Sequence, residues 1–186
     1  MIGALFGGND YLEVHSGLLN RVQTSWGADT INTYGGGGAI RGGNDNDTIN
    51  ITAGQFDIVN GGPADDILTN SCKYTGEGTS SWAGTLAGGL GNDTLINKGS
   101  GNFYGGPGSD TFQPGSFYTD AHGLACGLMI IQDFTHGEDI LDLSALGSSY
   151  STSPYSYDGA NGLGIFVTDS TGRDWNCCIL IGVDSL

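Results

Sequence analysis

Large apolar residues recur at a nearly constant interval over the first 113 positions of the chain. The recurring position is apolar or aromatic in every unit except the one holding Glu77, and it reads Leu12, Val22, Ile31, Ile40, Ile49, Val59, Leu68, Glu77, Leu86, Leu95, Tyr104 and Phe112. Its immediate neighbours are mostly polar, which is the alternation of a short strand with one buried and one exposed face. The pattern predicts a stack of short strands that each add one inward side chain to a continuous core.

A second recurring position lies two residues before each apolar one, and it is often aspartate. Across the same units it reads Asp10, Asn20, Asp29, Gly38, Asp47, Asp57, Asp66, Thr75, Gly84, Asp93, Asn102 and Asp110. Residues 88–96 and 105–113 give the complete nonapeptide G-G-x-G-x-D-x-U-x, where U is a large apolar residue. A flexible glycine-rich linker would not keep a bulky residue in register over so many units, so the repeat predicts a fold.

Two strands and two turns make one coil of about eighteen residues. We therefore expect an all-β fold, a parallel β-roll or β-helix of about six coils, over residues 1–113. Alternate turns then fall into two rows. The first row holds Asp10, Asp29, Asp47, Asp66, Gly84 and Asn102, and the second holds Asn20, Gly38, Asp57, Thr75, Asp93 and Asp110.

Stacked turns of this composition predict calcium sites. Glycine permits the positive φ of a tight turn and leaves carbonyl oxygens unshielded, and aspartate adds a carboxylate, so each turn offers the oxygen donors that Ca²⁺ prefers. The predicted sites are Asp10/Asp29, Asp29/Asp47 and Asp47/Asp66 in the first row and Asp93/Asp110 in the second. Asp45 and Asp65 lie beside the first row. Each aspartate is also explained as a turn cap without metal, and for the isolated Asp57 the two explanations are equally good.

Composition and charge restrict the partners. The 186 residues include 35 glycines, and the formal net charge is −15. Such a charge disfavours nucleic acid and anionic lipid, which both reward a basic patch. No run is long enough to span a membrane, and the first residues lack the basic segment of a secretion signal.

Residues 114–186 differ, because the glycine–aspartate repeat stops there and larger side chains increase. We expect a β-rich cap that covers the last apolar layer, with strands at 164–168 and 178–183 joined by a turn near 170–173. Asp139 lies in a G-x-D-x-U segment and would cap the Asp110 site. Within the repeats, residues 71–84 are the most irregular, and we expect an outward loop or a distorted coil there.

The two complete nonapeptides, the phased degenerate ones and the segment from Asp133 to Ser144 make the chain resemble the RTX (repeats-in-toxin) family, with a C-terminal module similar to that of serralysins. This resemblance implies a parallel β-roll with Ca²⁺ between stacked turns, and type I secretion through a signal in the C-terminal region. By position it implies carboxylates from Asp29, Asp47, Asp66, Asp93, Asp110 and Asp139, a place for Asp133 beside them, and carbonyls from Gly89, Gly91, Gly106 and Gly108. The four cysteines depart from the family, whose members commonly lack them.

Catalytic signatures are weak, so we expect no enzyme. His15, His122 and His136 are dispersed, and a turn histidine explains His136 better than an acid/base or zinc site. Cys72, Cys126, Cys177 and Cys178 are equally compatible with disulfides and with free thiols. Outward-facing Thr30, Asn32, Thr48, Asn50 and Thr85 would form a flat polar array that suits ice or carbohydrate, although ordinary strand propensity also explains the threonines.

The sequence therefore predicts a calcium-stabilised, secreted structural or adhesion module, with the roll as the functional body of a surface layer, filament or virion. Its expected partners are calcium, further copies of itself or a surface polysaccharide. The alternative is an accessory module of a secreted enzyme that degrades polysaccharide or protein, and a weaker one is an ice- or carbohydrate-binding surface.

Overall fold

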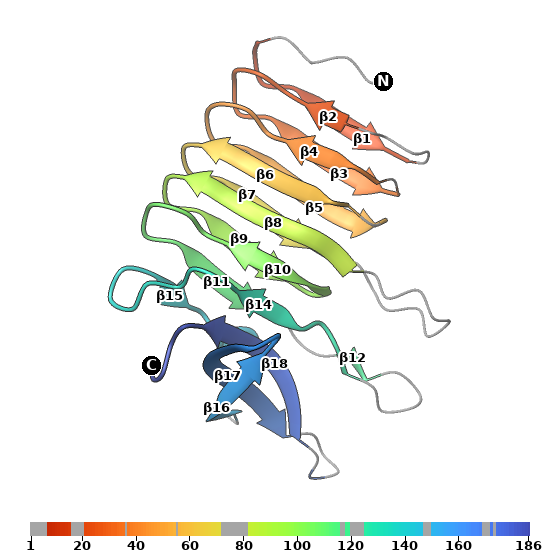
Figure 1. Cartoon of the computed structure of the whole chain (residues 1–186). Coiled ribbons are helices and arrows are strands. Elements are labelled where there is room, and N and C mark those ends of the chain that lie inside the picture. Colours follow the sequence, from red (N-terminus) through yellow and green to blue (C-terminus); the bar gives the residue numbers. More distant parts are fainter. Residues whose placement is uncertain are drawn as a thin grey trace.

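The computed structural model describes residues 7–15, 21–35, 37–54, 56–71, 82–115, 118–119, 125–146, 150–168, 172 and 174–186. Its strands form two sheets that lie one behind the other (Figure 1). The seven-stranded sheet consists, in spatial order, of β1 (Tyr11–Val14), β3 (Thr30–Tyr34), β5 (Thr48–Ala53), β7 (Ile67–Asn70), β9 (Thr94–Asn97), β11 (Thr111–Pro114) and β15 (Ile140–Leu141). All its neighbouring strands are parallel.

The nine-stranded sheet lies opposite. Its parallel part consists of β2 (Arg21–Gln23), β4 (Ala39–Arg41), β6 (Ile58–Pro63), β8 (Trp82–Leu90), β10 (Ser100–Tyr104) and β14 (Met129–Ile131). It continues through β18 (Asp174–Ile181), β17 (Ala160–Thr168) and β16 (Tyr150–Tyr157), and outside both sheets lie the hairpin β12 (Tyr118–Thr119)–β13 (Ala125–Cys126) and a 3₁₀ turn at Ser144–Leu146. The predicted all-β parallel architecture is confirmed.

The core consists of two rows of side chains that meet between the sheets, one row from each sheet. In the seven-stranded sheet, Leu12 aligns with Ile31, Ile49, Leu68, Leu95, Phe112 and Leu141. In the other sheet, Val22 aligns with Ile40, Val59, Leu86, Phe103, Ile131 and Leu180. Most of these side chains are fully buried. Every second side chain of a strand faces inward, so several strands bury a second residue beside this row, such as Thr33, Ile51 and Asn70.

One predicted core position is wrong. Phe103 is fully buried, whereas Tyr104 is 40% exposed, so the inward residue of β10 is Phe103. The register pairs Phe103 with Leu86 across the sheet. The eight-residue step of the repeat therefore lies between Leu95 and Phe103, and not before Phe112.

The last three strands add an antiparallel end to the nine-stranded sheet. β18 runs parallel to β14, and β17 and β16 then add to its free edge as antiparallel strands. β17 contains the expected strand at 164–168. The expected strand at 178–183 is present in β18 only as far as Ile181, and of the expected turn near 170–173 only residue 172 lies in the described part of the chain. Cys177 and Cys178 in β18 are free thiols and fully buried. Burial raises the pKa of Cys177 to about 12, so this thiol stays protonated.

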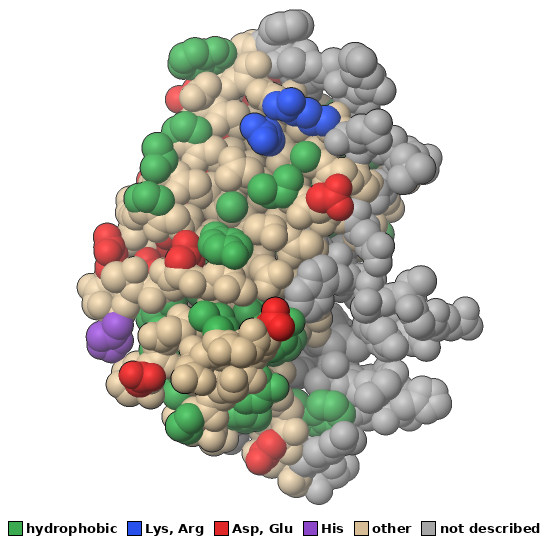
Figure 2. Space-filling view, viewed as in Figure 1, with side chains coloured by type: hydrophobic (Ala, Val, Ile, Leu, Met, Phe, Trp, Pro, Cys, Tyr) green, Lys and Arg blue, Asp and Glu red, His purple; other side chains and the backbone are tan. Residues whose placement is uncertain are grey.

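The outer surfaces carry few charges. On the face of the nine-stranded sheet seen in Figure 2, uncharged polar groups and backbone predominate, and acidic side chains gather at the left edge, where the turns of Figure 1 join the two sheets. Thr30, Asn32, Thr48 and Asn50 align on the seven-stranded sheet, but Thr85 lies in β8 of the other sheet. The predicted array is therefore confined to the first four of these residues.

In the turns that carry the recurring aspartates of the seven-stranded sheet, the residue two positions before each aspartate has a positive φ. Glycine holds this position at Gly8, Gly27, Gly91, Gly108 and Gly137, whereas Asp45 has φ 74° and Ala64 has φ 84°. The strain of the positive φ at Asp45 is offset by a hydrogen bond, because Asp45 Oδ2 accepts the Gly27 amide at 3.0 Å. Ala64 has no polar side chain with which to do the same, so its strain is not offset in this way.

We therefore expect Ala64→Gly to stabilise the protein. Relief of the left-handed strain exceeds the added flexibility of the unfolded chain by about 0.5–1 kcal/mol, which corresponds to a rise in Tm of about 2–3 °C. The matched control is Ala28→Gly, in the turn of Asp29 on the same side of the roll, at an exposed residue without positive φ. That change should lower Tm slightly, and equal shifts for both variants in thermal denaturation would contradict the strain at Ala64.

Candidate metal centre

Seven aspartates form one continuous column along the side of the roll. In each step, the backbone amide of one aspartate donates to Oδ1 of the next at 2.7–2.9 Å, and the order is Asp10, Asp29, Asp47, Asp66, Asp93, Asp110 and Asp139. Each member immediately precedes a strand of the seven-stranded parallel sheet, so the column repeats at about the 4.8 Å spacing of a sheet. The column is the main concentration of charge in the described structure.

The prediction of two acidic rows is wrong. Asp66 and Asp93 are 27 residues apart, one nonapeptide more than the usual coil, yet Asp66 N donates to Asp93 Oδ1 at 2.8 Å. The strands that follow them also pair in register, Ile67 with Thr94. The extra residues shift Asp93 and Asp110 to the side of Asp66. The unit that causes the shift lies within residues 71–84, where an irregular loop is expected, and residues 72–81 are outside the described part of the chain.

Asp57 lies in the opposite row of turns, away from the column. Its amide donates to Gly38 O, and its carbonyl accepts from Thr85 N, so its nearest turns carry glycine and not aspartate. The side chain is exposed. Among the described residues of that row it has no carboxylate partner, and the interpretation as a turn aspartate fits it better than a metal site.

The second carboxylate oxygen of the column is what a metal would use. Oδ2 of Asp29, Asp47, Asp66, Asp93 and Asp110 is buried and has no hydrogen-bond partner in the structure. These five side chains are at most 2% exposed. A buried carboxylate oxygen without a partner is costly, so the column has an unmet requirement for positive charge or for protons.

Glycine makes room for these oxygens. A Cβ at Gly61, Gly88 or Gly105 would stand 2.1 Å from Oδ2 of the aspartate in its own turn, and one at Gly42 would stand 2.3 Å from Asp47 Oδ2. The first glycine of the nonapeptide is thus required by the carboxylate and not only by the backbone. In the coil of Asp29 this position is Thr24, which is buried and donates its hydroxyl to Gly42 O. The first turn therefore differs from those of Asp47 to Asp110.

The carbonyls expected as ligands face the next turn. A Cβ at Gly106 would stand 2.0 Å from Gly89 O, and one at Gly108 would stand 1.7 Å from Gly91 O. Successive turns are therefore in direct contact, with main-chain oxygens between them. Gly106 and Gly108 occupy the same positions one turn further along the roll.

Burial sets the protonation of the column. Desolvation, strengthened by the charges of neighbouring aspartates, raises the pKa of Asp66 to about 7 and those of Asp47 and Asp110 to about 6. Desolvation raises the pKa of Asp93 to about 6 as well, with the Asp65 charge as a smaller cause. Hydrogen bonds from the backbone amides lower each value only in part. The column without metal is thus partly protonated near neutral pH.

Asp133 and Asp139 complete the C-terminal end. Asp133 accepts the amides of Gly105 and Gly106, each at 3.0 Å, on its two oxygens. Asp139 accepts Asp110 N on Oδ1 and Thr135 N, at 2.7 Å, on Oδ2. Both carboxylates are therefore used as caps of the last turn. Beside the column, Asp65 Oδ1 accepts Asn92 N at 2.7 Å, which places it in an outer position comparable to that of Asp45.

This donor set fits Ca²⁺ better than a transition metal. In the described residues no three His, Cys, Asp or Glu side chains converge as a metal cluster. Each interval between turns instead offers carboxylates of two neighbouring aspartates and main-chain carbonyls. Hard oxygen donors of this kind, with several carbonyls among them, suit Ca²⁺, whereas zinc sites use convergent histidine and cysteine.

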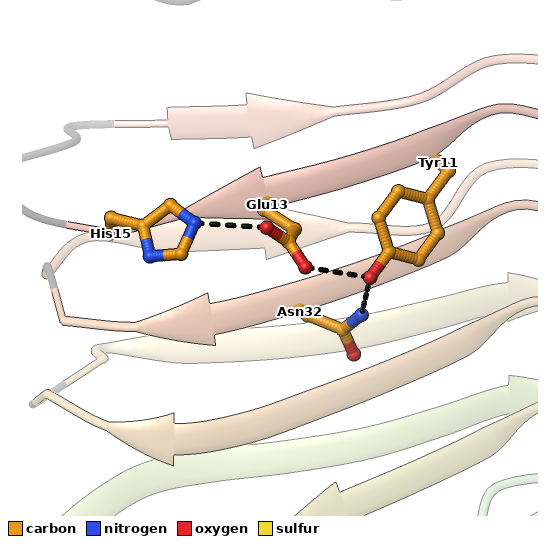
Figure 3. A network of polar contacts seen from close by, with 4 residues as sticks. All are labelled: Tyr11, Glu13, His15 and Asn32. Atoms are coloured by element: carbon orange, nitrogen blue, oxygen red, sulfur yellow. Dashed lines mark hydrogen bonds and ion pairs between the residues drawn. The ribbon is translucent and has the colours of Figure 1, made fainter.

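A second polar cluster lies on the outer face of the first coil (Figure 3). Glu13 accepts Tyr11 OH at 2.7 Å and lies 2.9 Å from His15 Nε2, and Asn32 Nδ2 donates to Tyr11 OH. The His15 ring also stacks on Tyr34 with centroids 4.9 Å apart. The spacing of alternate residues along one strand predicts a shared face for Tyr11, Glu13 and His15. Their side chains are solvent-exposed, so the cluster orders a strand edge and encloses no reaction site.

No protein-family model matches this chain, and no curated protein shows significant similarity to it. Among the described residues, no helix has the length and apolar character needed to cross a membrane.

Proposed function

We propose that this chain is a calcium-binding, calcium-stabilised module of the RTX type that acts outside the cell as a structural or adhesion element without catalysis. The observation that carries the proposal is the row of buried, unpartnered Oδ2 atoms on consecutive turns. A turn cap explains the Oδ1 atoms, which accept amides, but it does not explain a second oxygen kept free of partners and of neighbouring side chains.

Asp47, Asp66, Asp93 and Asp110 would hold the ions together with carbonyls of the adjoining turns. Bound Ca²⁺ supplies the positive charge that offsets carboxylate desolvation and repulsion between neighbouring turns. Because the sites exist only when the coils are stacked, the free energy of metal binding adds to that of folding. Extracellular modules commonly bind Ca²⁺ with Kd values of about 10⁻⁴–10⁻³ M, so folding would follow export into a calcium-rich medium.

Asp66→Asn tests this role, because its expected effect changes sign with calcium. Without the metal the variant loses one buried carboxylate but keeps an Oδ1 acceptor for Asp47 N, so in chelator it should keep more β-structure than the wild type and unfold at a higher temperature. With saturating calcium the variant lacks one ligand charge, and the increase in Tm conferred by calcium should shrink by about 5–10 °C. Thermal denaturation with and without calcium measures both effects, and isothermal titration should count fewer ions bound.

The matched control is Asp57→Asn, which removes the same charge from an exposed turn outside the column. Its Tm should change little and equally in both conditions. Equal shifts of Asp66→Asn with and without calcium, together with an unchanged ion count, would show that Asp66 is only a turn cap.

A further inference from the structure

The outer face of the nine-stranded sheet carries a polar line that runs along the roll. One outward side chain from each successive strand lies in register, and the line consists of Gln23, Arg41, Asn60, Ala87, Tyr104 and Gln132. With a strand spacing of about 4.8 Å, its five intervals span about 24 Å. The line lies on the sheet face, apart from the buried aspartate column.

A hollow of about 370 Å³ lies over the first part of this line. It is lined by the strand residues Gln23, Arg41 and Asn60, and also by Trp26 and by Pro63 at the end of β6. Trp26 is 67% exposed, an unusual degree for an indole. An exposed flat aromatic ring beside amide groups offers an apolar face for stacking and donors and acceptors for hydroxyl groups.

The charge of this hollow is opposite to that of the molecule. Arg21 and Arg41 project from β2 and β4, and Arg21 donates to Gln23 Oε1. In the described part of the chain the one ion pair is His15–Glu13, so neither arginine pairs with a carboxylate. The basic side chains visible in Figure 2 accordingly gather over the N-terminal coils. On a chain with a net charge of −15, this placement favours an anionic group at the hollow.

A second hollow, of about 290 Å³, lies over the other end of the line. Tyr104, Gln132 and Tyr157 line it, and Gln132 Nε2 donates to Asn102 Oδ1 at 3.0 Å. Asp158 also lines it, so this end favours hydroxyl groups over a second anion. Only the small side chain of Ala87 lies on the line between the two hollows.

We propose that this face binds an extended acidic polysaccharide along the roll axis, with a uronate carboxylate on Arg41, a sugar ring on Trp26 and further rings over Tyr104 and Tyr157. This inference rests on the proposed adhesion role and names its partner. Guanidinium groups bind carboxylates with two parallel hydrogen bonds, and aromatic rings stack on the apolar faces of sugars. Two hollows on one straight line suit a polymer, whereas a small ligand would need only one.

The test is binding of oligogalacturonates of about six sugars, chosen to extend along the line of about 24 Å, to the full, calcium-loaded chain by isothermal titration. Trp26→Ala and Arg41→Gln should each weaken binding about tenfold or more. The matched controls are Tyr11→Ala, an exposed aromatic on the other sheet, and Lys98→Gln, an exposed cation elsewhere. Both should bind as the wild type does. A neutral oligosaccharide of equal length and a poly-glutamate peptide should bind at least about tenfold more weakly.

Equal binding of poly-glutamate would reduce the site to a charge effect and overturn the sugar assignment. If the neutral oligosaccharide binds as tightly as the oligogalacturonate, the proposal that the polysaccharide is acidic is overturned. Unchanged affinity in both site variants would mean that calcium bridges uronates to surface aspartates, and no binding at all would also reject the site. Circular dichroism of each sample separates these results from the proposed calcium role, because that role fails only if the fold is independent of calcium.

Discussion

Chelation of calcium at neutral pH should abolish most of the β-structure of this protein. Five buried aspartates would then face one another across adjacent turns with their Oδ2 atoms unpartnered. Two charges about 4.8 Å apart repel by about 3 kcal/mol at an effective dielectric constant near 20. A few such pairs equal the typical stability of a whole domain, about 5–15 kcal/mol, so the stacked coils are not expected to persist without the metal.

Far-UV circular dichroism with excess chelator, followed by about 5 mM Ca²⁺, measures this effect. The β-signal should be lost with chelator and return on addition of calcium. Magnesium is the control, and it should restore much less, since it requires a smaller octahedral shell and gives up its water reluctantly. Identical spectra in chelator and in calcium would contradict a structural role for the metal.

Mild acid should restore the fold of the chelated protein. The folded-state pKa values of Asp47, Asp93 and Asp110 are raised to about 6 and that of Asp66 to about 7, whereas an unfolded aspartate titrates near its ordinary value of 3.8. Between these values the folded state binds more protons than the unfolded state. Stability without metal therefore increases as the pH falls from about 7 towards 4, and this gain is lost again as the pH rises through the folded-state pKa values.

The expected outcome is a metal-free Tm about 10 °C higher at pH 5 than at pH 8, or β-structure that appears only at the lower pH. With calcium the dependence should reverse, because protons compete with the metal for the same oxygens and affinity falls in acid. Replacing Asp66 by Asn should weaken the acid effect, and Asp57→Asn should leave it unchanged. A chelated protein that becomes less stable in mild acid would contradict the buried, charged column.

The sequence predicted the parallel fold because period and chemistry agreed in each coil. Tyr104 was predicted to face the core in place of its neighbour Phe103. The reason is that the single eight-residue step of the repeat was assigned to the wrong turn. The error over Asp93 and Asp110 had a different source. Counting by nines assumes that each unit crosses to the other sheet. The stretch between Asp66 and Asp93 breaks that assumption, and the irregular composition of residues 71–84 does not reveal to which side the next aspartates return.

The site was predicted in part. Glycine spacing and aspartate recurrence indicate which residues approach one another, but burial of Oδ2 and the hydrogen bond from the Thr24 hydroxyl to Gly42 O appear only in the structure. Trp26, Arg41 and Asn60 had no shared signal, since they come from three coils and differ in residue type. Their position around one hollow depends on the register between strands, which a repeat pattern reports only for inward positions.

The separation between Asp66 and Asp93 has a consequence for how such a chain is assembled. Although this stretch is longer by one nonapeptide, the next coil pairs in register with the preceding one, and Ile67 lies beside Thr94. The register of a coil is therefore set by its contacts with the neighbouring coil and not by the number of residues between them. A stack of this kind can therefore accommodate a whole extra unit between two coils without loss of strand register.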